Sequence, residues 1–131
     1  MKGFGDQFKN IKKKNSKNKS SQEQIINQAI QLHLKGNITE AAKFYKYCIN
    51  QGFNDHRIFV NYAGILQKFG KLQEAELSLR KVIEMKPDLV EAHYNLGSIL
   101  SNLGKLQEAE LSLRKVIEMK PDLVEAHYNL G

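Results

Sequence analysis

The sequence predicts an all-α protein built from helix pairs that recur every 34 residues. The 28 residues from Gly70 to Gly97 return unchanged from Gly104 to Gly131, and self-similarity at a fixed period of this size marks a repeat architecture. Apolar residues recur with helical spacing, and glycine or proline interrupts them at regular intervals. Strands are not expected, because no alternating run of β-branched residues is bounded by hairpin turns.

Composition suits a folded protein, since 41% of the 131 residues are hydrophobic and 26% are charged. No apolar run approaches the ~20 residues that a transmembrane helix needs. The N-terminal lysines are not followed by an apolar stretch, so a secretory signal peptide is not expected. The single cysteine, Cys48, cannot form an intramolecular disulfide and fits a reducing compartment, which predicts a cytoplasmic protein. Its helical, apolar surroundings predict a small buried side chain.

The positive charge is concentrated at the N-terminus. Residues 1–20 contain seven lysines and one acidic residue, which accounts for the whole net charge of +6. The second half of this segment is almost purely polar, so residues 1–20 are predicted to form a basic flexible leader. Phe4, Phe8 and Ile11 have the spacing of one short amphipathic helix. The leader therefore offers an alternative function, tethering to nucleic acid or to an acidic membrane.

The remaining chain divides into units of helix, tight turn and helix. The predicted units are 22–55, 56–89 and 90–123, and residues 124–131 form part of the first helix of a fourth unit. Gly36, Gly70 and Gly104 are placed to close the first helix of each unit in a left-handed conformation. The predicted helix N-caps are Ser20 or Ser21, Thr39 and Asp88.

The spacing within each unit resembles the tetratricopeptide repeat (TPR), a 34-residue unit with fixed positions for bulky, small and proline residues. The resemblance covers about residues 22–131 and implies a right-handed solenoid of antiparallel helix pairs. The third unit matches with His93, Leu96, Gly97, Leu100, Ala109, Leu113 and Pro121, and the second with Phe59, Tyr62, Ala63, Leu66, Ala75, Leu79 and Pro87. The first unit is degenerate, with Phe53 where proline is expected.

Small residues are predicted where the two helices of a unit cross. Gly97, Ala63 and Ala29 lie on the first helices, and Ala41, Ala75 and Ala109 lie on the second. Enlarging either set should overpack the crossing at a cost of roughly 1–3 kcal/mol.

Catalytic chemistry is not predicted, because the chain has no nucleophile–base set and no glycine-rich phosphate loop. His93 and His127 occupy the bulky position of the repeat, so we interpret them as packing residues rather than metal ligands. Glu74, Glu76, Glu108 and Glu110 recur with the period and are interpreted as solvated helix faces. No enzyme, cofactor or metal is expected.

Asparagine recurs once per unit, at Asn27, Asn61, Asn95 and Asn129. The sequence around it, with Tyr-Asn-Leu-Gly, is most similar to the TPR arrays of O-linked N-acetylglucosamine transferases. That resemblance implies a ladder of amides that grips the backbone of an extended peptide in the concave groove, since a carboxamide both donates and accepts hydrogen bonds. The alternative is a structural role, in which each amide satisfies neighbouring backbone groups. The remaining predicted groove residues are Val60, Gly64, Lys68, Tyr94, Ser98, Asn102 and Tyr128.

These observations predict a scaffold that binds a protein or an extended peptide in the concave groove of a TPR superhelix. Lys68 is the one charged residue predicted in the groove, so a basic clamp for a C-terminal carboxylate is not expected. An alternative hypothesis is that the chain is the N-terminal substrate-targeting module of a larger glycosyltransferase-like or sulfotransferase-like enzyme. A third expectation is self-association through the uncovered face of residues 106–120.

Overall fold

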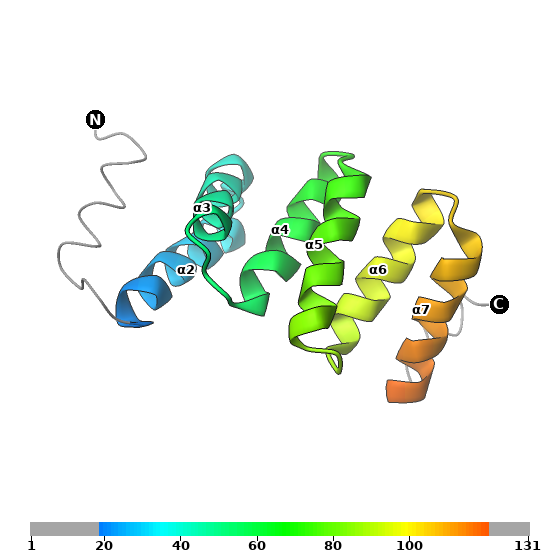
Figure 1. Ribbon diagram of the computed structural model, residues 1–131. Coiled ribbons are helices and arrows are strands. Elements are labelled where there is room, and N and C mark those ends of the chain that lie inside the picture. The colour runs from blue at the N-terminus through cyan, green and yellow to red at the C-terminus, as the bar shows by residue number, and fades with distance from the viewer. Residues whose placement is uncertain (1–18, 121–131) are drawn as a thin grey trace. The chain divides into compact units, whose positions relative to one another are not determined.

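The computed structural model describes residues 19–120, and these residues form six helices with no strand (Figure 1). The helices are α2 (Lys19–Leu34), α3 (Ile38–Asn50), α4 (His56–Lys68), α5 (Leu72–Met85), α6 (Val90–Asn102) and α7 (Leu106–Met119). The predicted all-α class is therefore confirmed. The predictions for the leader, including Phe4, Phe8 and Ile11, and for residues 124–131 lie outside the described residues.

The chain divides into two compact units, Met1–Ile58 and Phe59–Gly131. The first unit contains α2 packed against α3, and the second contains α6 packed against both α5 and α7. Helix α4 begins in the first unit and continues into the second. Each helix reverses direction relative to its predecessor within these packed pairs, as Figure 1 shows.

The turns between paired helices are closed by glycine, as predicted. Gly36, Gly70 and Gly104 have φ values of +85°, +75° and +81°, which a side chain with a Cβ atom adopts at a cost. At the end of α4, Lys71 N donates to Leu66 O at 2.8 Å and Gly70 N donates to Gln67 O at 3.0 Å. This is the Schellman pattern, and it satisfies carbonyl groups that the end of a helix leaves open.

The predicted helix N-caps are wrong. Ser20 and Ser21 lie inside α2, α3 is capped by Asn37 rather than Thr39, and α6 is capped by Leu89 rather than Asp88. Neither Asn37 nor Leu89 makes a side-chain capping bond. A capping carboxylate does occur at the start of α4, where Asp55 Oδ1 accepts the backbone N–H of Arg57 at 2.9 Å.

The core of the second unit is a band of small and branched apolar residues from α4 to α7. Gly97 lies where α6 crosses α7, and a Cβ atom there would lie 2.9 Å from both Cγ and Cδ2 of Leu113. This contact confirms that the crossing requires a small residue. The cluster consists of Val60, Ala63, Leu66, Ala75, Leu79, Val82, Ala92, Leu96, Ile99, Leu100 and Ala109.

The first unit has a separate buried set around Phe44 and Tyr45. Cys48 is fully buried, as predicted. Burial, with a smaller contribution from the charge of Asp55, raises the pKa of its thiol to about 12. The thiol is therefore a packing group rather than a nucleophile at neutral pH.

None of the helices between residues 19 and 120 combines the length and apolar character needed to cross a membrane.

Candidate functional site

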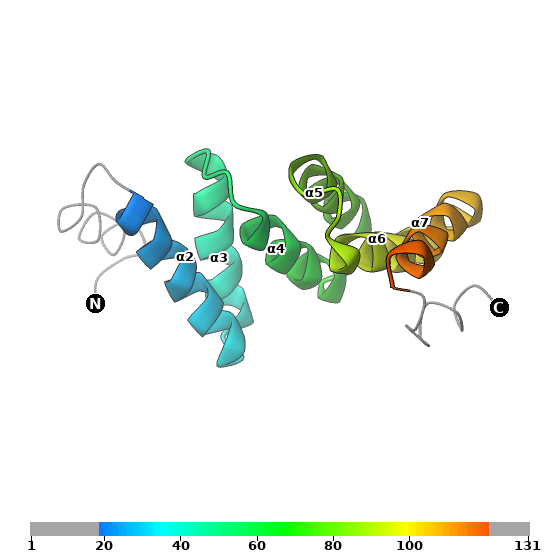
Figure 2. The same ribbon diagram turned by 90° about the horizontal axis from the view of Figure 1, so that it is seen from below.

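Two of the four recurring asparagines lie at equivalent positions of the second unit. Asn61 is on α4 and Asn95 is on α6, and both are half-buried. Figure 2 shows these first helices on one side of α5. Asn27 is exposed on α2 in the first unit, and Asn129 lies outside the described residues.

The side-chain amides of Asn61 and Asn95 have no hydrogen-bond partner among residues 19–120. Buried polar groups in proteins are normally paired, and a half-buried amide retains access to solvent or to a ligand. A structural role would have shown itself as a bond to a neighbouring backbone group. The arrangement thus leaves two donors and one acceptor per amide available for an incoming peptide unit.

The residue one turn after Asn61 leaves open space on α4. A Cβ atom added to Gly64 would meet nothing within 4 Å, so the surface after Asn61 is open. Tyr94 and Ser98 are half-buried on α6, and Lys68 and Asn102 are exposed near the ends of their helices. Tyr128 lies outside the described residues.

Val60 departs from the predicted groove. Its side chain is 6% exposed and belongs to the core cluster, so it offers almost no surface to a ligand. Helical spacing alone did not separate it from Asn61, because adjacent positions on a helix lie only about 100° apart.

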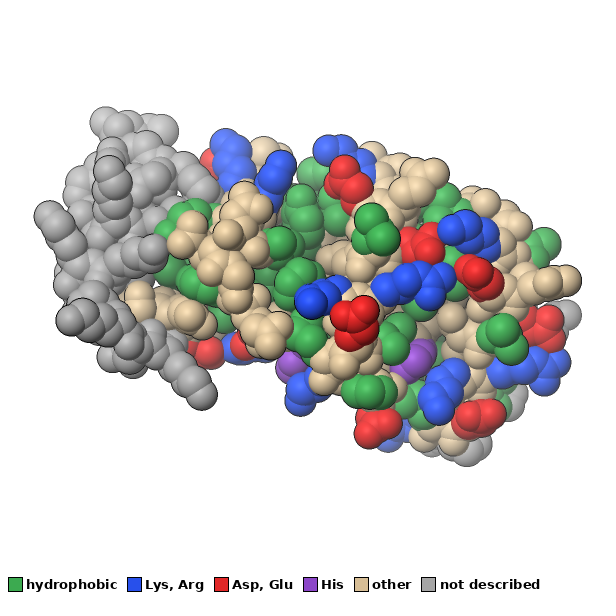
Figure 3. Space-filling model, viewed as in Figure 1, with side chains coloured by type: hydrophobic (Ala, Val, Ile, Leu, Met, Phe, Trp, Pro, Cys, Tyr) green, Lys and Arg blue, Asp and Glu red, His purple; other side chains and the backbone are tan. Residues whose placement is uncertain are grey.

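A second polar arrangement, on α5 and α7, was not predicted. Glu76 accepts hydrogen bonds from Lys105 Nζ at 3.0 Å and from Arg80 Nε at 2.9 Å. Arg80 also donates to Glu108 at 3.2 Å. These four residues form a charged joint between two successive helix pairs, and Figure 3 shows basic and acidic side chains intermixed over this part of the surface.

The joint corrects the prediction for Glu76. Its side chain is only 11% exposed rather than solvated, whereas Glu74, Glu108 and Glu110 are exposed as expected. The hydrogen bond from Lys105 outweighs burial and, with the bond from Arg80, holds the pKa of Glu76 below its usual value.

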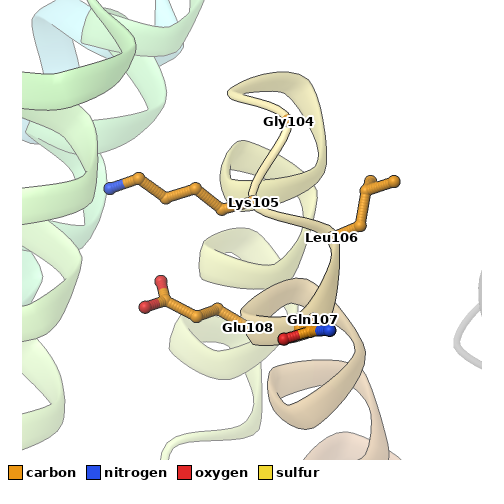
Figure 4. A pocket seen from close by; sticks show the side chains of 5 residues that line it. All are labelled: Gly104, Lys105, Leu106, Gln107 and Glu108. Atoms are coloured by element: carbon orange, nitrogen blue, oxygen red, sulfur yellow. The ribbon is translucent and has the colours of Figure 1, made fainter.

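The turn before α7 borders an open hollow of about 440 Å³ lined by residues 104–108. In Figure 4 the side chains of Lys105 and Glu108 point the same way, whereas Leu106 points in the opposite direction. A second hollow, of about 430 Å³, lies at residues 85–89. Both hollows border turns, and neither includes a candidate groove residue.

The two units also contain polar contacts with a structural purpose. In the first unit Arg57 bonds Asp55 at 2.8 Å and Glu23 at 2.9 Å, and the hydrogen bond from Arg57 holds the pKa of Asp55 below its usual value. In the second unit His93, 9% exposed, lies with Nε2 2.7 Å from the carbonyl oxygen of Pro87. This bond supports the packing interpretation of His93, and His127 lies outside the described residues.

No group of three or more histidine, cysteine or carboxylate residues within residues 19–120 has the arrangement of a metal site.

The structure is that of a helical-repeat protein: its helices are paired, left-handed glycines close the turns, and a small residue lies at the α6–α7 crossing. The tetratricopeptide repeat model matches residues 56–89 and 90–123, which is more than half of the chain. The chain therefore belongs to the tetratricopeptide repeat family. No curated protein matches it significantly.

Several solved structures share the fold at low sequence identity. MamA is 17% identical with a TM-score of 0.80, over 94% of this chain and 70% of that chain. The Arabidopsis OM64 TPR domain is 18% identical with a TM-score of 0.77, over 85% and 92%. The first TPR of Spaghetti (RPAP3), bound to the HSP90 peptide SRMEEVD, is 21% identical with a TM-score of 0.74, over 81% and 84%.

Proposed function

We propose that this chain is a protein–protein interaction scaffold that holds an extended peptide against the first helices of its repeats. The amides of Asn61 and Asn95 carry the proposal: they lie at equivalent positions of α4 and α6, and neither has a hydrogen-bond partner within residues 19–120. A carboxamide presents the same donor and acceptor groups as a peptide bond, so successive amides read the backbone of a peptide rather than its side chains.

Two further observations support a peptide ligand. The RPAP3 domain that shares this fold holds a peptide of HSP90, and the asparagine position resembles the peptide-gripping arrays of O-linked N-acetylglucosamine transferases. The local chemistry favours a ligand of low charge, because Lys68 is the one charged residue among the candidate groove residues. Ligand recognition through a terminal carboxylate would require more positive charge at this surface.

We place this activity in the cytoplasm, since a single buried thiol suits a reducing compartment. The proposed function is binding without catalysis.

The test is peptide binding by the variant Asn61→Ala/Asn95→Ala. Each lost bond contributes about 0.5–1.5 kcal/mol net, so the pair should weaken binding about 5- to 150-fold. The probe is a random peptide library displayed on phage, selected on the unmodified chain, with affinities of the selected peptides then measured by calorimetry. Because neither amide is bonded within residues 19–120, the melting temperature should stay within about 2 °C of the parent.

The matched control is Asn50→Ala/Asn54→Ala, which removes two exposed asparagines outside the candidate groove. It should bind the selected peptides as the parent does. A loss of stability in Asn61→Ala/Asn95→Ala with unchanged peptide affinity would assign these amides a structural role and reject the ladder.

A further inference from the structure

We propose that Gly64 forms a notch on α4 that receives a large apolar side chain of the bound peptide, and that this notch determines which peptides bind. The inference rests on the proposed peptide site and names the class of ligand that the site selects. It comes from a glycine that neither its backbone conformation nor the packing of the described residues explains. The α4 notch is the space over Gly64, one turn after Asn61.

Gly64 differs from the other glycines within residues 19–120. Gly97 has a helical backbone, but a Cβ atom there would lie 2.9 Å from Leu113. Gly64 is not among the glycines with positive φ, and a Cβ atom added to it would meet nothing within 4 Å. The remaining four glycines have positive φ values, which favour glycine: Gly36, Gly52, Gly70 and Gly104.

The glycine makes α4 less stable than the helix could be. Gly64 lies inside α4, where glycine is less favourable than alanine because it loses more backbone entropy on folding. The equivalent positions of the neighbouring repeats carry Ile30 and Ser98, so the repeat itself does not require glycine here. Departures from local preference are expected where a residue serves function rather than stability. The close approach of a ligand is such a function.

Neighbouring helix pairs leave this position of the repeat open. The pair α6–α7 follows Gly64 in the same unit and places no atom within 4 Å of an added Cβ atom. The pair α4–α5 precedes Ser98, the equivalent residue of α6, and α5 packs against α6. Ser98 nevertheless stays half-buried rather than buried. Neither a preceding nor a following pair therefore fills the position, and a ligand can reach it.

The notch and the peptide-holding amide lie on one face of α4. Residues three apart on a helix are neighbours, so Gly64 lies beside Asn61. At a rise of 1.5 Å per residue the two are about 4.5 Å apart along the helix axis. Successive side chains of an extended peptide are spaced about 3.3 Å apart along its chain. A peptide whose backbone is bonded by the Asn61 amide therefore has a side chain within reach of the notch.

The chemistry of the notch favours an apolar side chain. Backbone N–H and C=O groups inside a helix are bonded to each other, so the surface beside Gly64 offers no free donor or acceptor. Covering that surface with an apolar group is favourable. On α6 the hydroxyl of Ser98 occupies the equivalent place and both donates and accepts hydrogen bonds. The ligand is thus an extended peptide with a large apolar residue over α4 and a smaller, polar residue over α6.

The first test is the variant Gly64→Ala, with the phage-selected peptides of the unmodified chain as probes. The added methyl group occupies the notch, so the affinity of these peptides should fall about 10-fold. The same substitution improves helix propensity, so the melting temperature should rise by about 4 °C. Weaker binding by a more stable protein cannot result from unfolding. The matched control is Gln73→Ala, an exposed position of α5 outside the candidate groove, which should leave the affinity unchanged.

The second test moves the notch by one repeat. The double variant Gly64→Ser/Ser98→Gly exchanges the two residues, so the summed helix propensity stays nearly the same. Peptides selected on the unmodified chain should share a large apolar residue and a small polar residue at a fixed spacing. Peptides selected on the double variant should carry the two residues in the opposite order. The same order from both selections overturns the proposal.

The variant Asn61→Ala/Asn95→Ala separates this inference from the proposed function. Weaker binding by that variant, together with unchanged binding by Gly64→Ala, overturns the notch and retains the peptide site. Weaker binding by Gly64→Ala, together with unchanged binding by the asparagine variant, supports the notch and rejects the amide ladder. A peptide library that yields no ligand for the unmodified chain rejects both.

Discussion

Helices α5 and α7 have the same 14-residue sequence and different surroundings. In α5 the residues Glu76 and Ser78 are buried, whereas the equivalent Glu110 is exposed and Ser112 is half-buried. Leu72 is half-buried and its counterpart Leu106 is exposed. One amino-acid sequence thus yields a helix covered on two sides and a helix with an open face. The difference shows that the neighbouring helix pair, and not the local sequence, determines which polar residues of a repeat are buried and hydrogen-bonded.

The largest expected effect comes from shortening the equivalent leucines of the two helices. Leu79 is fully buried within the core cluster, and Leu113 is buried against Gly97 at the edge of that cluster. Leu79→Ala should cost toward the upper end of about 2–5 kcal/mol, and Leu113→Ala nearer the lower end, because the edge can collapse into the space left. Urea unfolding followed by circular dichroism measures both. Equal losses would mean that the two helices are equally enclosed.

Removing the equivalent carboxylate from each helix tests the difference between α5 and α7. Glu76→Gln removes the charge that accepts hydrogen bonds from Lys105 and Arg80, and it should lower the free energy of unfolding by about 1–2 kcal/mol. Glu110→Gln affects a single exposed pair and should change stability by less than about 0.5 kcal/mol. The two variants differ only in which copy is changed, so urea midpoints compare them directly. A cost for Glu110→Gln as large as that for Glu76→Gln would remove the distinction between the helices.

The smallest effect is the pH dependence of the same pair. The pKa of Glu76 lies below its ordinary value of 4.5 in the folded chain, chiefly because of the bond from Lys105. A lowered pKa stabilises the fold above the unfolded pKa, and this contribution disappears as pH falls through the folded pKa. The stability difference between the parent and Glu76→Gln should therefore be constant above about pH 6 and shrink below about pH 4.5. Glu110→Gln serves as the baseline at each pH.

Periodicity predicted the helices, the left-handed glycines and the small residue at Gly97, because these depend on backbone geometry and local spacing. It did not predict the helix caps, since Asn37 and Leu89 precede their helices without a capping bond. Burial of Glu76 depends on Lys105, 29 residues further along the chain, and single-helix patterns carry no such information. The recurrence of a lysine and a glutamate around each turn was the available signal.

The candidate groove stays a prediction, to which the structure adds the burial of its residues. Helical spacing placed Asn61 and Asn95 at equivalent positions, and the structure adds that their amides are unpaired among residues 19–120. The assignment of Val60 to the groove is wrong, because Val60 belongs to the core cluster together with residues of α5 and α6. Sequence spacing identifies a helix face, whereas the packing partner determines how much of that face remains accessible.

The charged joint has a consequence for how such a protein can change its length. One side of the joint is the pair Glu76 and Arg80, and Lys71 and Glu74 are the equivalents of the other side, Lys105 and Glu108. Both pairs lie within one 28-residue copy and recur intact in the next. A recombination event between the copies that adds or removes 34 residues would therefore create no new kind of interface. Each repeat would still meet a repeat that carries the same charged residues. The number of repeats can then change without any change in the residues that form the interfaces between them.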